Sequence, residues 1–122
     1  MTFEVRLSSQ AKQDLGDIYD YIAHDLQNPL VAEELLGRLE KAILSLDEMP
    51  ERYRAYEKEP WHSRGLRVMP VERYIVYYIP DAESHIVRIG GLEEGEKLRR
   101  LRWVSPSSSL LKSFFDTLRY DF

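Results

Sequence analysis

The sequence contains no cysteine among its 122 residues. Without thiols it can form neither a disulfide framework nor a thiolate metal site, and both absences are typical of a cytoplasmic protein. Its three histidines, His24, His62 and His85, are far apart in the chain, and none is followed by a second metal ligand three or four residues later. We therefore expect no zinc site, and no residue pattern indicates another cofactor.

Long hydrophobic runs are also missing, since no stretch of about 18 consecutive apolar residues occurs. We therefore expect no membrane-spanning helix and no membrane partner. The first ten residues, MTFEVRLSSQ, lack the basic start and the apolar stretch of a signal peptide. With 122 residues, 43% of them hydrophobic, the chain is long enough for one domain with its own core and too short for two.

An excess of positive charge is absent as well. The net charge is −4, and residues 1–50 carry 4 Lys and Arg against 10 Asp and Glu. Residues 51–102 carry 11 basic and 9 acidic residues, so only the middle of the chain could face a phosphate backbone. This distribution argues against a large nucleic-acid interface but leaves a compact one open.

The first half of the chain has the hydrophobic spacing of one strand followed by two helices. Apolar residues first alternate with polar ones, which is the period of a half-buried strand. Ser8 or Ser9 then offers a hydroxyl cap to one helix, and Asn28 with Pro29 begins another. Each helix carries one apolar stripe, and the short link between them predicts an antiparallel hairpin. The expected spans are residues 2–8 for the strand, 9–26 for the first helix and 29–48 for the second.

Two further strands are expected in RGLRVMPVERYIVYYIP, residues 64–80, which is dense in Val, Ile and Tyr. Met69 and Pro70 are expected to form the tight turn between them. A last short strand follows in SHIVRIGG, residues 84–91, and its two final glycines are expected to end it. The element order is therefore β-α-α-β-β-β, an α+β fold in which a helical hairpin packs on one face of an antiparallel sheet.

Two segments do not fit this regular pattern. Residues 51–63 show no period, and we expect a mobile, charged connection there. Residues 91–122 form an atypical tail with a Ser-rich linker, SPSSS, and an amphipathic candidate helix, LLKSFFDTLRYDF. We expect residues 1–90 to form the domain, and 91–122 an extension that is helical or partly disordered and could join two copies in a homodimer.

Three stretches of the chain, AKQDLGDIYDYI, NPLVAEELLGRLEKAILSLDEMPERY and GLRVMPVERYIVYYI, together resemble the RelE/ParE family of small bacterial toxins. These are the toxin halves of type II toxin–antitoxin modules, also called plasmid stabilisation or addiction modules. The resemblance covers about residues 3–90 and implies a growth-inhibiting toxin that a cognate antitoxin neutralises. RelE-like members enter the ribosome and cleave mRNA with basic residues, whereas ParE-like members poison DNA gyrase.

Arg67 is the candidate catalytic residue that the resemblance selects, because RelE-like toxins carry a basic residue at this point of the strand. RNA cleavage without a metal needs a group that activates the 2′-hydroxyl, cations that stabilise the phosphate, and an acid for the leaving oxygen. Other cations that could take part lie nearby in the sequence, and they are Arg64, Arg73, Lys58, His62 and Arg88.

Other positions depart from the nuclease pattern. Met69 and Tyr74 stand where RelE-like toxins tend to carry cations, and GGLEEGEK supplies acids where an Arg and a Tyr or His are usual. Arg67 can equally be a structural clamp or a surface residue, and His62 beside Trp61 can be a packing pair in a loop. The pattern therefore favours a ParE-like gyrase poison.

Two other functions stay open. One is a RelE-like, metal-independent and ribosome-dependent mRNA endoribonuclease, for which Arg67→Ala should abolish cleavage of mRNA. The other is an inactive toxin homologue that only binds an antitoxin, which the loss of family pattern after residue 90 suggests. The expected partners are accordingly an antitoxin, together with DNA gyrase or the ribosome and its mRNA.

Overall fold

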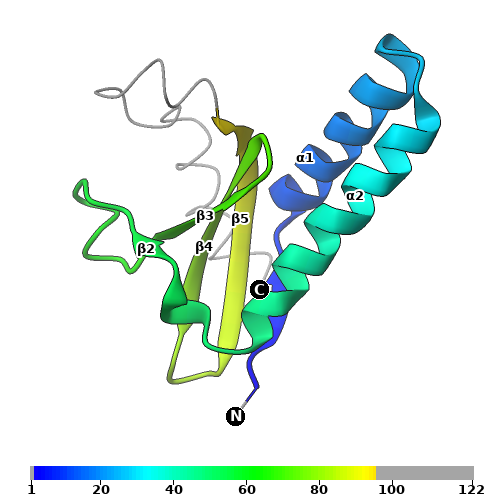
Figure 1. The fold of residues 1–122 in the computed structure, drawn as a ribbon. Helices are drawn as coiled ribbons and strands as arrows, with labels where there is room; N and C mark the ends of the chain where they lie inside the picture. The colour runs from blue at the N-terminus through cyan, green and yellow to red at the C-terminus, as the bar shows by residue number, and fades with distance from the viewer. Residues whose placement is uncertain (1, 96–122) are drawn as a thin grey trace.

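The structure, a computed structural model, describes residues 2–95 as a helical hairpin against one sheet. Two antiparallel helices lie side by side along one side of a twisted sheet, and the link between them projects beyond the strands (Figure 1). In chain order the elements are β1 (Glu4–Leu7), α1 (Ser9–Asp20), α2 (Pro29–Leu44), β2 (Arg54–Ala55), β3 (Arg67–Val71), β4 (Tyr74–Asp81) and β5 (Ile86–Glu94). The predicted α+β fold is confirmed.

The sheet is mixed in its strand directions. The strand order is β1-β5-β4-β3-β2, and β1 runs parallel to β5, whereas every other neighbouring pair is antiparallel. A parallel pair needs a long connection between its strands, and here the whole of the intervening chain provides it. The first and the last described strands therefore lie side by side, which corrects the expectation of a purely antiparallel sheet.

Both helices begin at the residues that the sequence predicts. The Ser8 hydroxyl accepts a hydrogen bond at 3.0 Å from the backbone amide three residues later, and the Asn28 side chain does the same at 3.4 Å. These bonds satisfy amides that have no partner within the helix. α1 continues as a π-helical turn, Tyr21–Asp25, and α2 as a 3-10 turn, Ser45–Asp47, so the predicted helical spans are confirmed.

The apolar stripes of the hairpin pack on one face of the sheet and form the main core. Leu39 and Ile43 of α2 are fully buried there with Val76 and Ile89 of the strands. Burial of each such side chain stabilises the fold by about 1.5–3 kcal/mol. The helices and the sheet are therefore held together chiefly by this shared apolar layer.

The predicted turn at Met69 and Pro70 is wrong, because both residues lie inside β3. Met69 is 1% exposed, and its side chain packs in the main core rather than lying in an exposed turn. Pro70 follows the part of β3 that pairs with β2, so its nitrogen faces an edge where no amide is needed. The chain instead turns at Glu72 and Arg73, where Glu72 has a φ of +55°.

β5 does not end at its glycine pair, as expected, but continues to Glu94. Tyr77 pairs with Gly91 and Tyr78 with Ile89, which leaves Gly90 as the extra residue of a bulge. A glycine inside a strand often marks such a bulge rather than its end. The rest of the predicted tail, residues 96–122, lies outside the described residues, as does its expected role in a homodimer.

The segment 51–63 is more regular than expected. It contains most of a 3-10 turn, Pro50–Arg52, and the short strand β2, which pairs with the first residues of β3. Periodicity could not show these elements because each is only two or three residues long. Within residues 2–95, no helix is long and apolar enough to cross a membrane.

Candidate functional site

Side chains alternate between the two faces of the sheet along each strand. Met69 and Val76 belong to the main core beneath the helices, whereas their neighbours Val68, Ile75 and Tyr77 belong to a second cluster. We call the face that carries this second cluster the far face, because both helices lie on the other side (Figure 1). The second cluster consists of Leu66, Tyr77, Tyr56, Trp61, Val68, Ile75 and Ile79.

The centre of the far face is apolar and aromatic rather than basic. Leu66 and Tyr77 are buried, and the hydroxyl of Tyr77 has no hydrogen-bond partner within residues 2–95. Burial, followed by the negative charge of Glu93, raises the pKa of Tyr77. This phenol therefore stays protonated at neutral pH and is not a general base.

Arg67 lies on the helix-covered side of the sheet, where its partly buried side chain holds backbone. Its position in β3 is two residues before the buried Met69, on the same side of the strand. The Nη1 atom of Arg67 donates to the carbonyl oxygens of Tyr53 at 2.6 Å and Glu51 at 3.2 Å. The guanidinium thus fastens the segment before β2 to the sheet, as the clamp interpretation predicts.

Three other candidate cations, Lys58, His62 and Arg64, lie in the turns between β2 and β3. His62 Nδ1 lies 2.8 Å from the carbonyl oxygen of Tyr56. Trp61, next in the chain, packs against the second cluster. The contact of His62 with the Tyr56 carbonyl and the packing of Trp61 therefore both help to hold this loop in place.

Arg73 lies in the turn at the opposite end of β3 from Arg67. Four residues of an extended strand separate these ends by roughly 13 Å. Arg67 and Arg73 therefore do not converge on one phosphate-sized group.

The sequence does not indicate that an arginine of β1 lies beside an arginine of β5. Arg6 and Arg88 are register partners in the parallel pair, and each has an ion pair with an acid. The Arg6 Nη2 atom lies 2.9 Å from Glu4 Oε2, and the Arg88 Nη1 atom lies 3.1 Å from Asp81 Oδ2. Hydrogen bonds from Ser84 and then from Arg88 hold the pKa of Asp81 below its ordinary value. Only knowledge of the parallel pairing could have brought Arg6 beside Arg88.

A cavity of about 600 Å³ lies next to this pair, and Arg64, Arg88 and Asp81 are among its lining residues. Its arginines face two acids, Asp81 and Glu83, so the charges largely offset one another. Within residues 2–95, no group of three His, Asp or Glu side chains could hold a metal ion.

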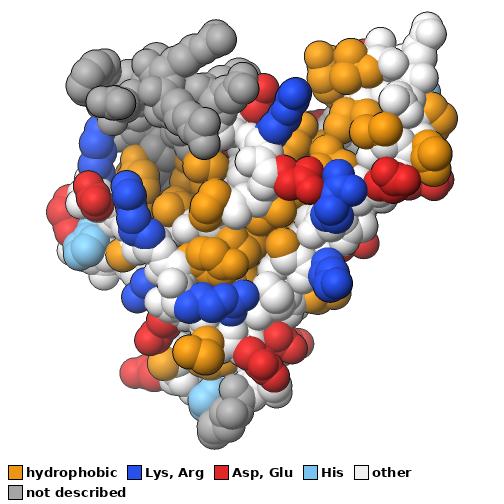
Figure 2. Space-filling view, in the orientation of Figure 1, with side chains coloured by type: hydrophobic (Ala, Val, Ile, Leu, Met, Phe, Trp, Pro, Cys, Tyr) orange, Lys and Arg blue, Asp and Glu red, His pale blue; other side chains and the backbone are white. Residues whose placement is uncertain are grey.

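Hydrophobic side chains are exposed between the hairpin and the strands, and Lys and Arg side chains border them (Figure 2). At the edge of the main core, Tyr53, Val71 and Tyr74 are only partly buried. Arg38 of α2 forms an ion pair with Glu72 in the β3–β4 turn, so it bridges the hairpin and the strands. This region offers apolar surface with a charged border, which is suited to a protein partner.

The family model that describes the ParE toxin of the type II toxin–antitoxin system parDE matches residues 5–96. This match covers about three quarters of the chain and runs from the second residue of β1 to past the end of β5. The chain belongs to the ParE toxin family. No curated protein sequence matches it.

Solved structures support the same fold for this ParE-family chain. A protein of the chromosomal ParDE system of P. aeruginosa has a TM-score of 0.63 and 17% identity, covering 76% of this chain and 96% of that one. The toxin–antitoxin complex RelBE2 of Mycobacterium tuberculosis gives 0.55 and 20%, covering 77% and 99%. A mutant of the E. coli toxin RelE in the free state gives 0.55 and 11%, covering 95% and 97%. At these identities the similarity establishes the fold alone.

Proposed function

We propose that this ParE-family toxin arrests growth by acting on DNA gyrase and is neutralised in the cytoplasm by a cognate antitoxin. The observation that carries the choice of gyrase over mRNA cleavage is the position of Arg67. This residue is the one cation that matches a nuclease position, and its guanidinium already donates to two backbone carbonyls on the helix-covered face.

The chemistry of RNA cleavage supports the same choice. A metal-independent nuclease must gather a base, an acid and phosphate-binding cations around one reacting group. Among the described residues, Lys58, His62 and Arg64 lie in a loop, Arg73 lies at the other end of β3, and the centre of the far face between them is apolar.

The apolar surface between the hairpin and the strands supports the antitoxin as partner. Two structural neighbours come from a ParDE system and from a RelBE2 toxin–antitoxin complex. Exposed hydrophobic side chains bordered by charges mark surfaces that other proteins cover (Figure 2). We therefore place the antitoxin contact on this surface, next to the Arg38–Glu72 ion pair.

The experiment is induced expression of the chain alone and together with any small open reading frame that adjoins its gene. We expect growth arrest that co-expression relieves, DNA breaks held by gyrase, and intact mRNA in primer extension. Cuts in translated mRNA that disappear in Arg67→Ala would overturn the gyrase assignment in favour of the nuclease. Normal growth, together with co-purification of the small protein, would show instead an inactive homologue that only binds its antitoxin.

A further inference from the structure

The projecting end of the helical hairpin carries an exposed apolar patch. Figure 1 shows the link between α1 and α2 extending beyond the strands, and Figure 2 shows hydrophobic side chains gathered on this end. Within residues 2–95, four of the six large hydrophobic side chains that are exposed lie in this short stretch, and their exposed fractions range from 42% to 65%. We call these four side chains the hairpin tip, and they are Tyr21, Leu26, Leu30 and Val31. Exposed apolar side chains that gather in one place mark a surface that another molecule covers.

The hairpin around this tip carries charge of one sign. Between Lys12 and Arg38 the chain has six Asp and Glu residues and no Lys or Arg. Five of these acids are exposed, namely Asp17, Asp20, Asp25, Glu33 and Glu34. The tip is therefore an apolar centre inside a negative field, which attracts cationic groups and repels anionic ones.

This charge decides which kind of molecule can cover the tip. A nucleic-acid backbone and the anionic headgroups of a membrane would both be repelled by it. A second copy of the chain would bring two acidic borders together, and like charges across an interface are strongly unfavourable. The matching occupant is another protein, with an apolar site bordered by Lys and Arg.

The proposed target offers this chemistry. An enzyme that holds DNA presents Lys and Arg side chains to the phosphates. An acidic protein can bind basic side chains of this kind that lie beside the DNA, although it is repelled by the DNA itself. The hairpin tip therefore suits the protein surface of gyrase rather than the DNA that gyrase holds.

The hairpin tip also adjoins the surface assigned to the antitoxin. Tyr74 lies at the edge of that surface, where it is only partly buried. Burial, followed by the charge of Glu94, raises the pKa of Tyr74, and the phenol of Tyr21 adds a smaller rise, so Tyr21 lies near Tyr74. An antitoxin that covers Tyr74 would therefore reach the tip and obstruct it, which links the two contacts to neutralisation.

From these observations we infer that the hairpin tip is the surface through which the toxin binds the gyrase protein, an inference that rests on the function proposed above. Leu30 and its apolar neighbours enter an apolar site of the enzyme. Asp25 and Glu33 face Lys and Arg side chains that border this site.

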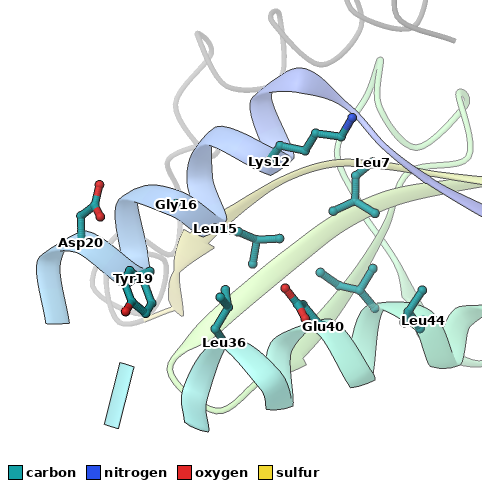
Figure 3. A pocket seen from close by; sticks show the side chains of 10 residues that line it. Leu7, Lys12, Leu15, Gly16, Tyr19, Asp20, Leu36, Glu40 and Leu44 are labelled. Carbon is teal, nitrogen blue, oxygen red and sulfur yellow. The ribbon is translucent and has the colours of Figure 1, made fainter. Parts of the chain in front are cut away.

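The first test compares one residue type at the two ends of α2. Leu30 and Leu44 are 65% and 58% exposed, and fourteen residues of helix separate them by about 21 Å. Figure 3 shows Leu44 at the opposite end of the groove between the helices from Asp20. In Leu30→Ser we expect the toxin concentration that halves DNA supercoiling by purified gyrase to rise at least about tenfold. The control Leu44→Ser should change it by less than about twofold.

The second test reverses one charge beside the tip. Glu33→Lys should weaken the inhibition of gyrase by about threefold or more, because it places a cation opposite cations. Glu48→Lys is the control, since Glu48 is also exposed but lies beyond the other end of α2, and it should leave the inhibition unchanged. Stronger inhibition by Glu33→Lys would overturn the inference, because the tip would then face phosphates.

The outcomes separate this inference from the proposed function. A wild-type chain that leaves supercoiling unchanged would overturn the gyrase assignment, and the inference with it. A wild-type chain that inhibits gyrase, with equal inhibition by Leu30→Ser and Leu44→Ser, would overturn the inference alone. Leu26→Ser, at a second exposed position of the tip, should weaken inhibition as Leu30→Ser does, and thermal unfolding should match the wild type in both. Full inhibition by these two variants, with loss of antitoxin co-purification, would assign the tip to the antitoxin instead.

Discussion

At the scale of single residues, Arg67 gives a direct test of its role as a clamp. Arg67→Ala leaves the carbonyl oxygens of Tyr53 and Glu51 without their donor. We expect the free energy of unfolding to fall by about 1.5–3 kcal/mol, the range for hydrogen bonds that involve a charged group. Chemical denaturation measures this change, and Arg54→Ala is the control, since Arg54 is exposed and forms a loose ion pair at 3.7 Å with the equally exposed Glu57.

A different result would restore the catalytic interpretation of Arg67. If Arg67→Ala unfolds at the same denaturant concentration as the wild type but no longer arrests growth, the arginine acts on the target. If Arg67 is a clamp, Arg67→Ala should lower the free energy of unfolding, and any loss of gyrase inhibition should follow from that loss of stability.

Tyr77 and Tyr78 are neighbours, and comparing them measures how much one buried hydrogen bond contributes to the free energy of unfolding. The hydroxyl of Tyr78 donates to the carbonyl oxygen of Pro50 at 2.6 Å, whereas the buried hydroxyl of Tyr77 has no partner in the part of the chain that the structure describes. Tyr78→Phe should therefore lower the free energy of unfolding by about 1–2 kcal/mol, and Tyr77→Phe should leave it unchanged or raise it. Equal losses in thermal or chemical unfolding would show that both hydroxyls are bonded.

The raised pKa of Tyr78 predicts that the stability of the protein depends on pH in the alkaline range. Burial raises the pKa of Tyr78 from its ordinary value of 10.0 to about 12. Because the folded state holds this proton more tightly, its contribution to stability is complete below pH 10 and is lost as the pH rises through 12. Tyr78→Phe should make the fall in unfolding free energy between pH 10 and 12 less steep, as denaturant titrations at a series of pH values would measure. Parallel curves for the wild type and Tyr78→Phe would refute the shift.

At the scale of elements, the two helix caps differ in how deeply they are embedded. Ser8 is fully buried, accepts from the Ala11 amide, and donates from its Oγ to the Gly90 carbonyl at 2.9 Å. It therefore joins the start of α1 to the bulge of β5, whereas the exposed Asn28 only caps α2. Ser8→Ala should cost about 2–3 kcal/mol and Asn28→Ala about 1 kcal/mol or less. Similar losses in denaturant titrations would mean that the bond to Gly90 adds nothing.

The helices were predictable because their signals are local. The Ser8 and Asn28 caps and the apolar stripes lie within a few residues of the structure that they specify. The sequence misplaces the turn after β3 because proline usually interrupts a strand, whereas Pro70 lies beyond the two residues of β3 that pair with β2, where a missing amide costs no pairing. The extent of β5 was missed for a related reason, since Gly90 accommodates a bulge that only the pairing with β4 reveals.

At the scale of the whole molecule, the candidate site depends on pairings that sequence spacing does not contain. The family pattern points to Arg67, but its partners at Glu51 and Tyr53 lie 16 and 14 residues earlier in the chain. The neighbourhood of Arg6 and Arg88 depends on the parallel contact between the first and last strands. Side chains from distant segments therefore make up the candidate site, and local periodicity can give only the face on which each residue lies.

The extent of β5 also sets the size of the folding unit, which truncation can test. Ending the chain after residue 90 removes Leu92, 5% exposed in the main core, and the partners of the first four residues of β4. Ending it after residue 95 keeps all of these contacts. We expect the longer form to unfold in one cooperative transition, followed by circular dichroism in denaturant, and the shorter form to lose that transition. Cooperative unfolding of the 1–90 form would instead show that the sheet is stable without the pairing of residues 91–94 with β4. This single comparison therefore decides where the toxin domain ends.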